Sequence, residues 1–266
     1  MVKEKTGSKL LQPVALIFIF SFLLYANSIR NGYNLDDSYV TVTNPQHPDN
    51  ARVAMGIKGI PGIFTSHYVV SDEHNFDYRP VALASFAIEY QFFGSNPHVS
   101  HFFNVLIYAI TCVLLFVILS KLMKAYSVVL PLLIAFLFAA HPVHTEVVNN
   151  IKCRDELLSF LFGMISLHYF LQAAESRENK WIPLLKVVFF LVLALLSKKT
   201  AVLFVGLIPL SAWFFTAVNI KKAIAPVVLL IVAYLLFVMF KKAMLPPGAE
   251  VREFAFYENP LYFQHG

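Results

Sequence analysis

The stretch FFNVLIYAITCVLLFVIL, residues 102–119, contains no charged residue and predicts a helix that crosses a membrane. Similar apolar runs lie on both sides of it along the chain. Hydrophobic residues make up 58% of the sequence and charged residues 14%, whereas soluble globular proteins average about 45–50% and about 25%. A soluble domain could not bury this much apolar surface. The composition therefore predicts an all-α polytopic membrane protein.

We expect about seven transmembrane helices, which make residues 1–266 a single transmembrane domain. The first run follows a basic N-terminus but lacks a small-residue cleavage pattern, which favours a retained signal anchor over a signal peptide. A long first outer loop, 30–100, contains two amphipathic segments, 55–67 and 80–93, of a type that tends to lie in the membrane interface. The predicted spans are 11–29, 102–119, 126–140, 157–174, 182–196, 200–218 and 223–240.

Lys and Arg residues in the connections predict the orientation, since they are enriched on the cytoplasmic side. With a cytoplasmic N-terminus, the inner connections carry the basic residues at 3–9, 121–124, 177–180 and 221–222. The outer connections carry Lys152, Arg154, Lys198 and Lys199. We expect a multi-pass protein of the bacterial inner membrane or the endoplasmic reticulum membrane. Because topology accounts for the net charge of +5, we expect membrane lipid and no nucleic acid as a partner.

Polar clusters lie on the predicted outer side of the membrane. The first is the pair Asp36 and Asp37, which follows the first span. Adjacent carboxylates can bind a divalent cation or act as a general base toward a hydroxyl, although Asp is also common in turns. The second is Tyr78-Arg79-Pro80. The Arg79 guanidinium can hold a phosphate through its two-pronged fork, or it can extend from the membrane interface toward water.

The third cluster is the densest. It begins with His141-Pro142-Val143-His144-Thr145-Glu146 and continues to Arg154 and Asp155. Two histidines near a glutamate can reach one metal ion, but the spacing differs from that of His-Glu-x-x-His zinc proteases. The alternative is a polar connection whose residues cap helices. The number of imidazole and carboxylate groups in one short connection favours a functional site.

The fourth cluster, Ser197-Lys198-Lys199-Thr200, separates two apolar runs. Adjacent lysines at a membrane boundary suggest an anionic ligand such as a lipid phosphate, or lysines that extend toward water. Together the clusters fit a site where a phosphate-linked lipid donates a group to an acceptor outside the membrane. An acidic residue would deprotonate the acceptor or hold Mg²⁺ or Mn²⁺, and cations would stabilise the leaving phosphate.

The order of these motifs resembles a known family. Asp-Asp, Tyr-Arg-Pro, His-Pro-Val-His-Thr-Glu-Val-Val and Arg-Asp-Glu-Leu-Leu are similar to motifs in the N-terminal part of the transmembrane and tetratricopeptide-repeat O-mannosyltransferases and their bacterial relatives. These are membrane glycosyltransferases of the GT-C superfamily. Glu258-Asn259-Pro260-Leu261 resembles a later outer-loop segment. The chain has no tetratricopeptide repeats, so the resemblance implies the N-terminal portion of a larger module. That portion would be a glycosyltransferase by itself, an incomplete or inactive fragment, or a part completed by a separate chain.

The resemblance implies transfer of a sugar, often mannose, from a polyprenyl-phosphate donor to a hydroxyl of an acceptor protein or glycan. The catalytic base is then Asp36 or Asp37, and a divalent cation would lie at Asp37 and Glu146. Lys199 stands where the family has an acidic residue, which leaves Lys198 as the phosphate contact. The candidate substrate-binding residues are Arg79, His141, His144, Glu146, Arg154, Asp155 and Lys198.

Two other functions stay open. A transporter or flippase would also have many spans. Transporters, however, place polar groups near the membrane midplane on broken helices, and the predicted spans are largely apolar. A non-catalytic membrane scaffold that binds lipid or partner subunits is the other alternative.

Overall fold

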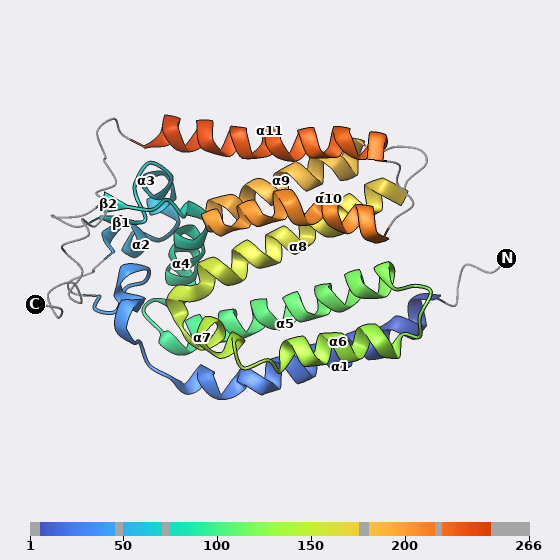
Figure 1. Ribbon diagram of the computed structural model, residues 1–266. Coiled ribbons are helices and arrows are strands. Elements are labelled where there is room, and N and C mark those ends of the chain that lie inside the picture. The colour runs from blue at the N-terminus through green and yellow to red at the C-terminus, as the bar shows by residue number, and fades with distance from the viewer. Residues whose placement is uncertain (1–5, 46–49, 71–74, 176–180, 216–219, 246–266) are drawn as a thin grey trace, which may run out of the picture.

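The computed structural model describes residues 6–45, 50–70, 75–175, 181–215 and 220–245. In these residues the regular structure is helical apart from one short antiparallel pair, β1 (Val69–Val70) with β2 (Asn75–Phe76). Long helices run side by side along one axis of the molecule (Figure 1). They are α1 (Thr6–Tyr25), α5 (Pro97–Leu122), α6 (Val129–Ala139), α8 (Arg154–Glu175), α9 (Trp181–Ser197), α10 (Leu203–Phe215) and α11 (Ile220–Met244).

Each predicted span overlaps one of these helices. Three stretches of the described residues are long and apolar enough to cross a membrane: Leu10–Arg30, Pro97–Leu122 and Ile151–Ala174. The apolar helices in α6, α9 and α10 are shorter. Length and composition thus confirm a helical membrane protein, and three helices meet the usual length for a span.

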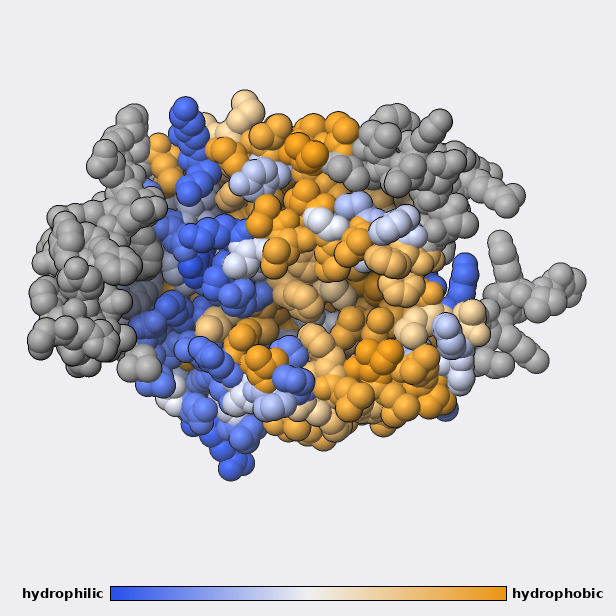
Figure 2. Space-filling view, viewed as in Figure 1, coloured by the Kyte–Doolittle hydropathy of each residue, from blue (hydrophilic) through white to orange (hydrophobic). Residues whose placement is uncertain are grey.

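Two hydrophobic cores hold the long helices together. Ile17 and Phe116 belong to the core between α1, α5 and α6. Leu171, Leu191 and Leu230 belong to the core between α8, α9 and α11. Many large apolar side chains point outward instead, as expected where lipid rather than water surrounds the helices. Figure 2 shows this apolar surface over the long helices and a hydrophilic surface at one end.

The first loop folds into short helices at that hydrophilic end. They are η1 (Ala26–Arg30), η2 (Leu35–Tyr39), α2 (Ala51–Ala54), η3 (Gly56–Gly59), α3 (Ile60–Phe64) and α4 (Pro80–Phe93). Helix α4 has the bounds of the predicted segment, because proline suits the first helical turn and Gly94 adopts a positive φ of 64° just after the last. A small core that includes Val53, Phe86 and Ile151 packs this loop against the connection before α8.

The described connections between the long helices lie at one or the other end of the bundle. Helix α7 (His144–Asn149) and η4 (Ile151–Cys153) join α6 to α8, and η5 (Lys199–Val202) joins α9 to α10. These connections lie at the same end as the first loop, and the connection from α5 to α6 lies at the other (Figure 1). The predicted polar clusters therefore share one end. The segments 177–180 and 258–261 lie outside the described residues.

Candidate functional site

Asp37 fixes the first loop to the connection before α8. Its side chain is 2% exposed, and its two carboxylate oxygens accept the backbone N–H groups of Asn34 at 2.8 Å and Lys152 at 3.0 Å. The Asn34 bond also caps η2. Burial raises the pKa of the Asp37 carboxyl, against the lowering effect of the two hydrogen bonds. Asp37 is thus a buried carboxyl that holds two distant segments together.

Asp36, its neighbour, lies at the surface. Its side chain is 51% exposed, and one carboxylate oxygen lies 2.6 Å from the Lys152 ammonium. Ion pairs this exposed contribute little free energy and separate readily. Asp36 is therefore the member of the acidic pair that a substrate can reach.

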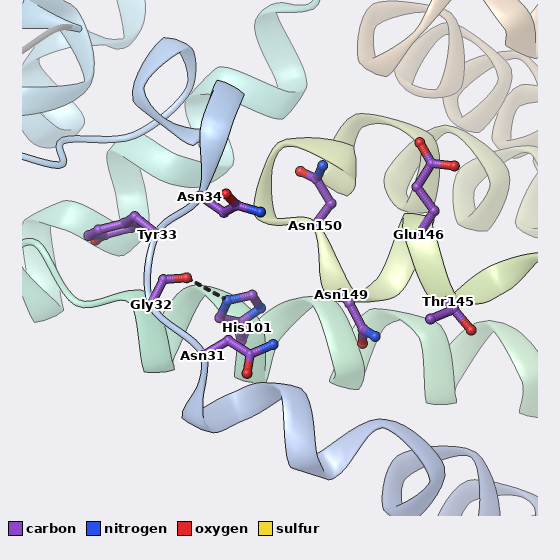
Figure 3. Close-up of a pocket in the computed structure, with 9 residues that line it drawn as sticks. All are labelled: Asn31, Gly32, Tyr33, Asn34, His101, Thr145, Glu146, Asn149 and Asn150. Atoms are coloured by element: carbon purple, nitrogen blue, oxygen red, sulfur yellow. Dashed lines mark hydrogen bonds between the residues drawn. The ribbon is translucent and has the colours of Figure 1, made fainter.

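A cavity of about 510 Å³, lined mostly by polar residues, lies against the first-loop segment that precedes the acidic pair (Figure 3). One wall is the first-loop segment 31–34, and the other is formed by residues of α7 and the position after it. His101 of α5 lies between the walls. The residues from the second wall are Thr145, Glu146, Asn149 and Asn150. The cavity has the size of a small-molecule site, and it includes the predicted substrate contact Glu146.

The two predicted histidines lie in different surroundings. His141 is exposed, whereas His144 is half-buried, with its ring centroid 4.4 Å from that of Phe138 and 5.5 Å from that of Tyr108. His144 and Glu156 line a second, mainly apolar cavity of about 250 Å³. Burial, followed by the nearby His141, lowers the pKa of His144, so its imidazole is neutral at pH 7. The histidines thus flank the site with one exposed ring and one neutral, packed ring.

Two predicted residues from separate segments, Arg79 and Lys198, meet at a third, Asp155. One Asp155 oxygen pairs with the Arg79 guanidinium and lies 3.5 Å from the Tyr68 hydroxyl. The other lies 3.5 Å from the Lys198 ammonium, which is 2.7 Å from a Glu156 oxygen. The structure therefore joins Arg79, Asp155 and Lys198 into one network.

Asp77 extends this network. It pairs with Arg79 and lies 3.3 Å from the Lys199 ammonium. Burial opposes the charge of Arg79, but Asp155 and Asp77 hold its pKa above the usual value. Burial also opposes the charge of Asp77 and by itself would raise its pKa. The positive charges of Arg79 and Lys199 outweigh burial and hold the pKa of Asp77 below its usual value. The network has three cations and three carboxylates, so their charges balance one another. Lys199, at 74% exposed, is its most open cation.

Arg154 lies inside the protein and not in either cavity wall. Its side chain is 2% exposed, and it pairs with Glu89 at 2.7 Å. It also donates to the Asn104 side chain at 2.8 Å and to the Ser100 carbonyl at 2.9 Å. These partners occupy the Arg154 guanidinium, which ties α8 to α4 and α5. In this structure Arg154 therefore does not face the cavities where a substrate contact was predicted.

The known proteins to which the chain is similar include O-mannosyltransferases of several animals. The chain is 25% identical over 209 residues to protein O-mannosyl-transferase TMTC3 of Mus musculus, which covers 78% of this chain and 22% of the relative. It is 31% identical over 189 residues to tmtc2 of Xenopus laevis, which covers 68% and 21%. The resemblance to the O-mannosyltransferases is confirmed. A third relative, F38B6.6 of Caenorhabditis elegans, is 24% identical over 266 residues, which covers 98% and 36%.

The chain thus spans about a fifth to about a third of the length of these O-mannosyltransferases. No family model matches the chain, and no solved structure does. The O-mannosyltransferase-like motifs named above lie at one end of the helical bundle, apart from segment 258–261, which is not described.

The predicted divalent cation has few ligands to hold it. Among the residues that the structure describes, no group of three or more His, Cys, Asp or Glu side chains could hold a metal ion. Both oxygens of Asp37 already accept backbone hydrogen bonds. The described residues do not fit a cation held by the protein alone. A cation at Asp37 and Glu146 stays a prediction.

Sequence reasoning did not select several residues of this site as candidates. His101, Glu89 and Asn104 are polar residues inside or beside apolar runs, and such isolation is a signal that a polar group has a partner inside the bundle. The contribution of Lys152 comes partly from its backbone N–H, which has no sequence signature.

Proposed function

We propose that this polar end transfers a sugar from a polyprenyl-phosphate donor to an acceptor hydroxyl. Mannose is proposed because the relatives are named O-mannosyl-transferases. The supporting observation is that exposed Asp36 follows segment 31–34, which forms one wall of a cavity lined mostly by polar residues, at the hydrophilic end of an apolar helical bundle. A lipid anchored in the surrounding membrane can present its head group at this depth, while a protein or glycan acceptor approaches from water.

In this proposal all seven long helices cross the membrane. The shorter helices α6, α9 and α10 require local thinning of the bilayer or contributions from flanking residues. The N-terminus lies in the cytoplasm, and the polar end faces outward. This orientation places the lysines near 121–124 on the cytoplasmic side, where lysine and arginine are enriched in membrane proteins.

Asp36 is the proposed general base. It takes the proton of the acceptor hydroxyl, whose oxygen then bonds to the anomeric carbon of the sugar. The bond between that carbon and the phosphate oxygen breaks, and polyprenyl phosphate leaves with the electron pair. A positioned base of this kind contributes about 10²–10⁴-fold to a rate. Asp37 does not touch the substrate in this scheme. It positions the loop through Asn34 and Lys152.

Lys198 is the proposed contact of the leaving phosphate. Its partner Glu156 is 36% exposed, so that carboxylate can turn toward water when a phosphate takes its place. Arg79 stays paired with Asp155 and Asp77 and supports the network from behind. Fixed cations that meet the charge developing on the leaving group lower the barrier to its departure.

The test uses the full chain reconstituted in liposomes. One sample receives polyprenyl-phosphate mannose with a labelled sugar, and another receives a labelled nucleotide sugar. We expect label to reach a serine- and threonine-containing acceptor from the lipid donor and not from the nucleotide sugar. Labelled lipid that yields no product with peptide or glycan acceptors would overturn the proposed activity for this chain.

A further inference from the structure

The cavity between the first loop and α7 contains buried acceptor atoms that have no partner. His101 Nε2 lies 3.3 Å from the Gly32 carbonyl and donates its hydrogen there, which leaves Nδ1 as an acceptor. This Nδ1 atom and the Oδ1 atoms of Asn149 and Asn150 are buried without a hydrogen bond. All three side chains line the same cavity. Unpartnered buried acceptors cost folding free energy, so three of them on side chains around one cavity point to a ligand that these side chains turn to meet.

The chemistry of these atoms selects the ligand. Three acceptors require a ligand with several hydrogen-bond donors. An ionised phosphate has acceptors only, and the Glu146 carboxylate in the cavity wall would repel it. A serine or threonine side chain brings one hydroxyl, which leaves two acceptors unmatched. A pyranose ring brings several hydroxyls in a rigid, compact arrangement that suits a cavity of about 510 Å³.

We propose that this cavity binds the pyranose ring of the donor sugar through its hydroxyl groups. His101, Asn149 and Asn150 accept hydrogen bonds from these hydroxyls, and Glu146 offers a further, charged acceptor. The inference rests on the proposed function for the source of the sugar, which is the glycosylated lipid. It separates the roles at the polar end, because the sugar lies in this cavity whereas the phosphate meets the cations of the Lys198 network.

The test compares binding of polyprenyl-phosphate mannose with binding of the same polyprenyl phosphate without sugar. The full chain is held in nanodiscs. We expect the wild-type chain to bind the glycosylated lipid more tightly. Asn149→Ala and Asn150→Ala should each weaken binding of this lipid by about fivefold, the effect of one neutral hydrogen bond, and leave binding of the sugar-free lipid unchanged.

Asn27→Ala is the matched control, because Asn27 is exposed in η1 and lies outside the cavity wall. It should change the affinity for neither lipid. Equal binding of both lipids by the wild type would overturn the proposed sugar site. So would an equal loss for both lipids in the Asn149 and Asn150 variants. A preference for the glycosylated lipid that these variants remove, without any sugar transfer, would retain the sugar site and reject the proposed activity.

If neither lipid binds, the same site is tested with soluble methyl α-mannoside. Bound sugar should slow amide hydrogen exchange across residues 144–150 in the wild type, and Asn149→Ala should remove this protection. Exchange that the sugar leaves unchanged in the wild type would overturn the inference. The failure of lipid binding by itself would count against the proposed donor.

Discussion

At the scale of single residues, Arg154 and Glu89 show how a buried ion pair locates the first loop. Charges taken out of water are costly unless each finds a partner. Arg154 meets this condition through Glu89, the Asn104 side chain and the Ser100 carbonyl, and it lies over the Phe86 ring at 3.9 Å. These contacts hold α4 against α5 and α8, and so they support the loop that carries the acidic pair.

Glu89→Gln should strongly destabilise the protein, because it leaves the Arg154 charge buried without a counter-charge. We expect a loss of about 3–5 kcal/mol in the free energy of unfolding, measured by denaturation in detergent micelles. Lys124→Gln, an exposed position at the opposite end, should change stability by less than about 0.5 kcal/mol. Wild-type stability in Glu89→Gln would show that the pair does not hold these helices.

His67 gives a pH dependence with a defined sign. It is 5% exposed, and neither ring nitrogen has a partner. Burial, then the charge of Lys241, lowers its pKa below 6.5, although the nearby Asp77 backbone opposes them. The unfolded chain therefore takes up a proton first as the pH falls, and stability drops below pH 6.5.

His67→Gln should reduce this acid-induced loss, because glutamine does not take up the proton. The measurement is the melting temperature at neutral pH and at successive values below 6.5. Asn27→Ala, which changes an exposed side chain that does not titrate, is the control and should leave the pH profile as in the wild type. An unchanged profile in His67→Gln would contradict the assignment to the buried ring.

At the scale of elements, α8 and α10 approach closely at Gly163. A methyl group added there would overlap the Phe204 ring. Gly163→Ala should therefore destabilise the protein by about 1–3 kcal/mol, the usual cost of an overfilled contact, in thermal unfolding. Phe204→Leu in the same chain should recover part of the loss, because the smaller side chain makes room.

Gly206→Ala in α10 is the matched control, since a Cβ atom there meets nothing within 4 Å. Helix propensity alone favours alanine by about 1 kcal/mol, so this variant should be neutral or more stable. Equal effects of the two alanine substitutions would show that Gly163 is not at a close helix contact.

The helices could be predicted from the sequence because their signals are local. Uncharged runs such as 102–119 and the proline that opens α4 act within one segment. The site depended more on contacts between segments. The sequence indicated that Arg79, Asp155 and Lys198 lie on one side of the membrane, but only the fold shows that they form one network.

The partners of Arg154 and Asp37 could not be predicted in the same way. The role of Arg154 depends on Glu89 in a distant helix, and Asp37 binds backbone N–H groups that every residue except proline carries. The residues that line the polar cavity likewise come from the first loop, α5 and α7. No local pattern in one segment contains this information.

At the scale of the whole molecule, the positions of the described connections predict which side chains meet each side of the membrane. Thr145 and Lys124 are exposed at opposite ends of the bundle. In a Cys153→Ser chain, a membrane-impermeant maleimide added outside intact cells should label Thr145→Cys. Lys124→Cys should react only after the membrane is permeabilised. The reverse pattern would contradict a cytoplasmic N-terminus.

The central claim is that the polar end is a sugar-transfer site with Asp36 as its base. Its most direct test is the initial rate of mannose transfer from polyprenyl-phosphate mannose by reconstituted Asp36→Asn, with wild type and Lys124→Gln as references. We expect Asp36→Asn to melt at the wild-type temperature, since Asp36 is exposed, but to transfer about 10²–10⁴-fold more slowly. Lys124→Gln should transfer at the wild-type rate. Transfer by Asp36→Asn at the wild-type rate would contradict the claim.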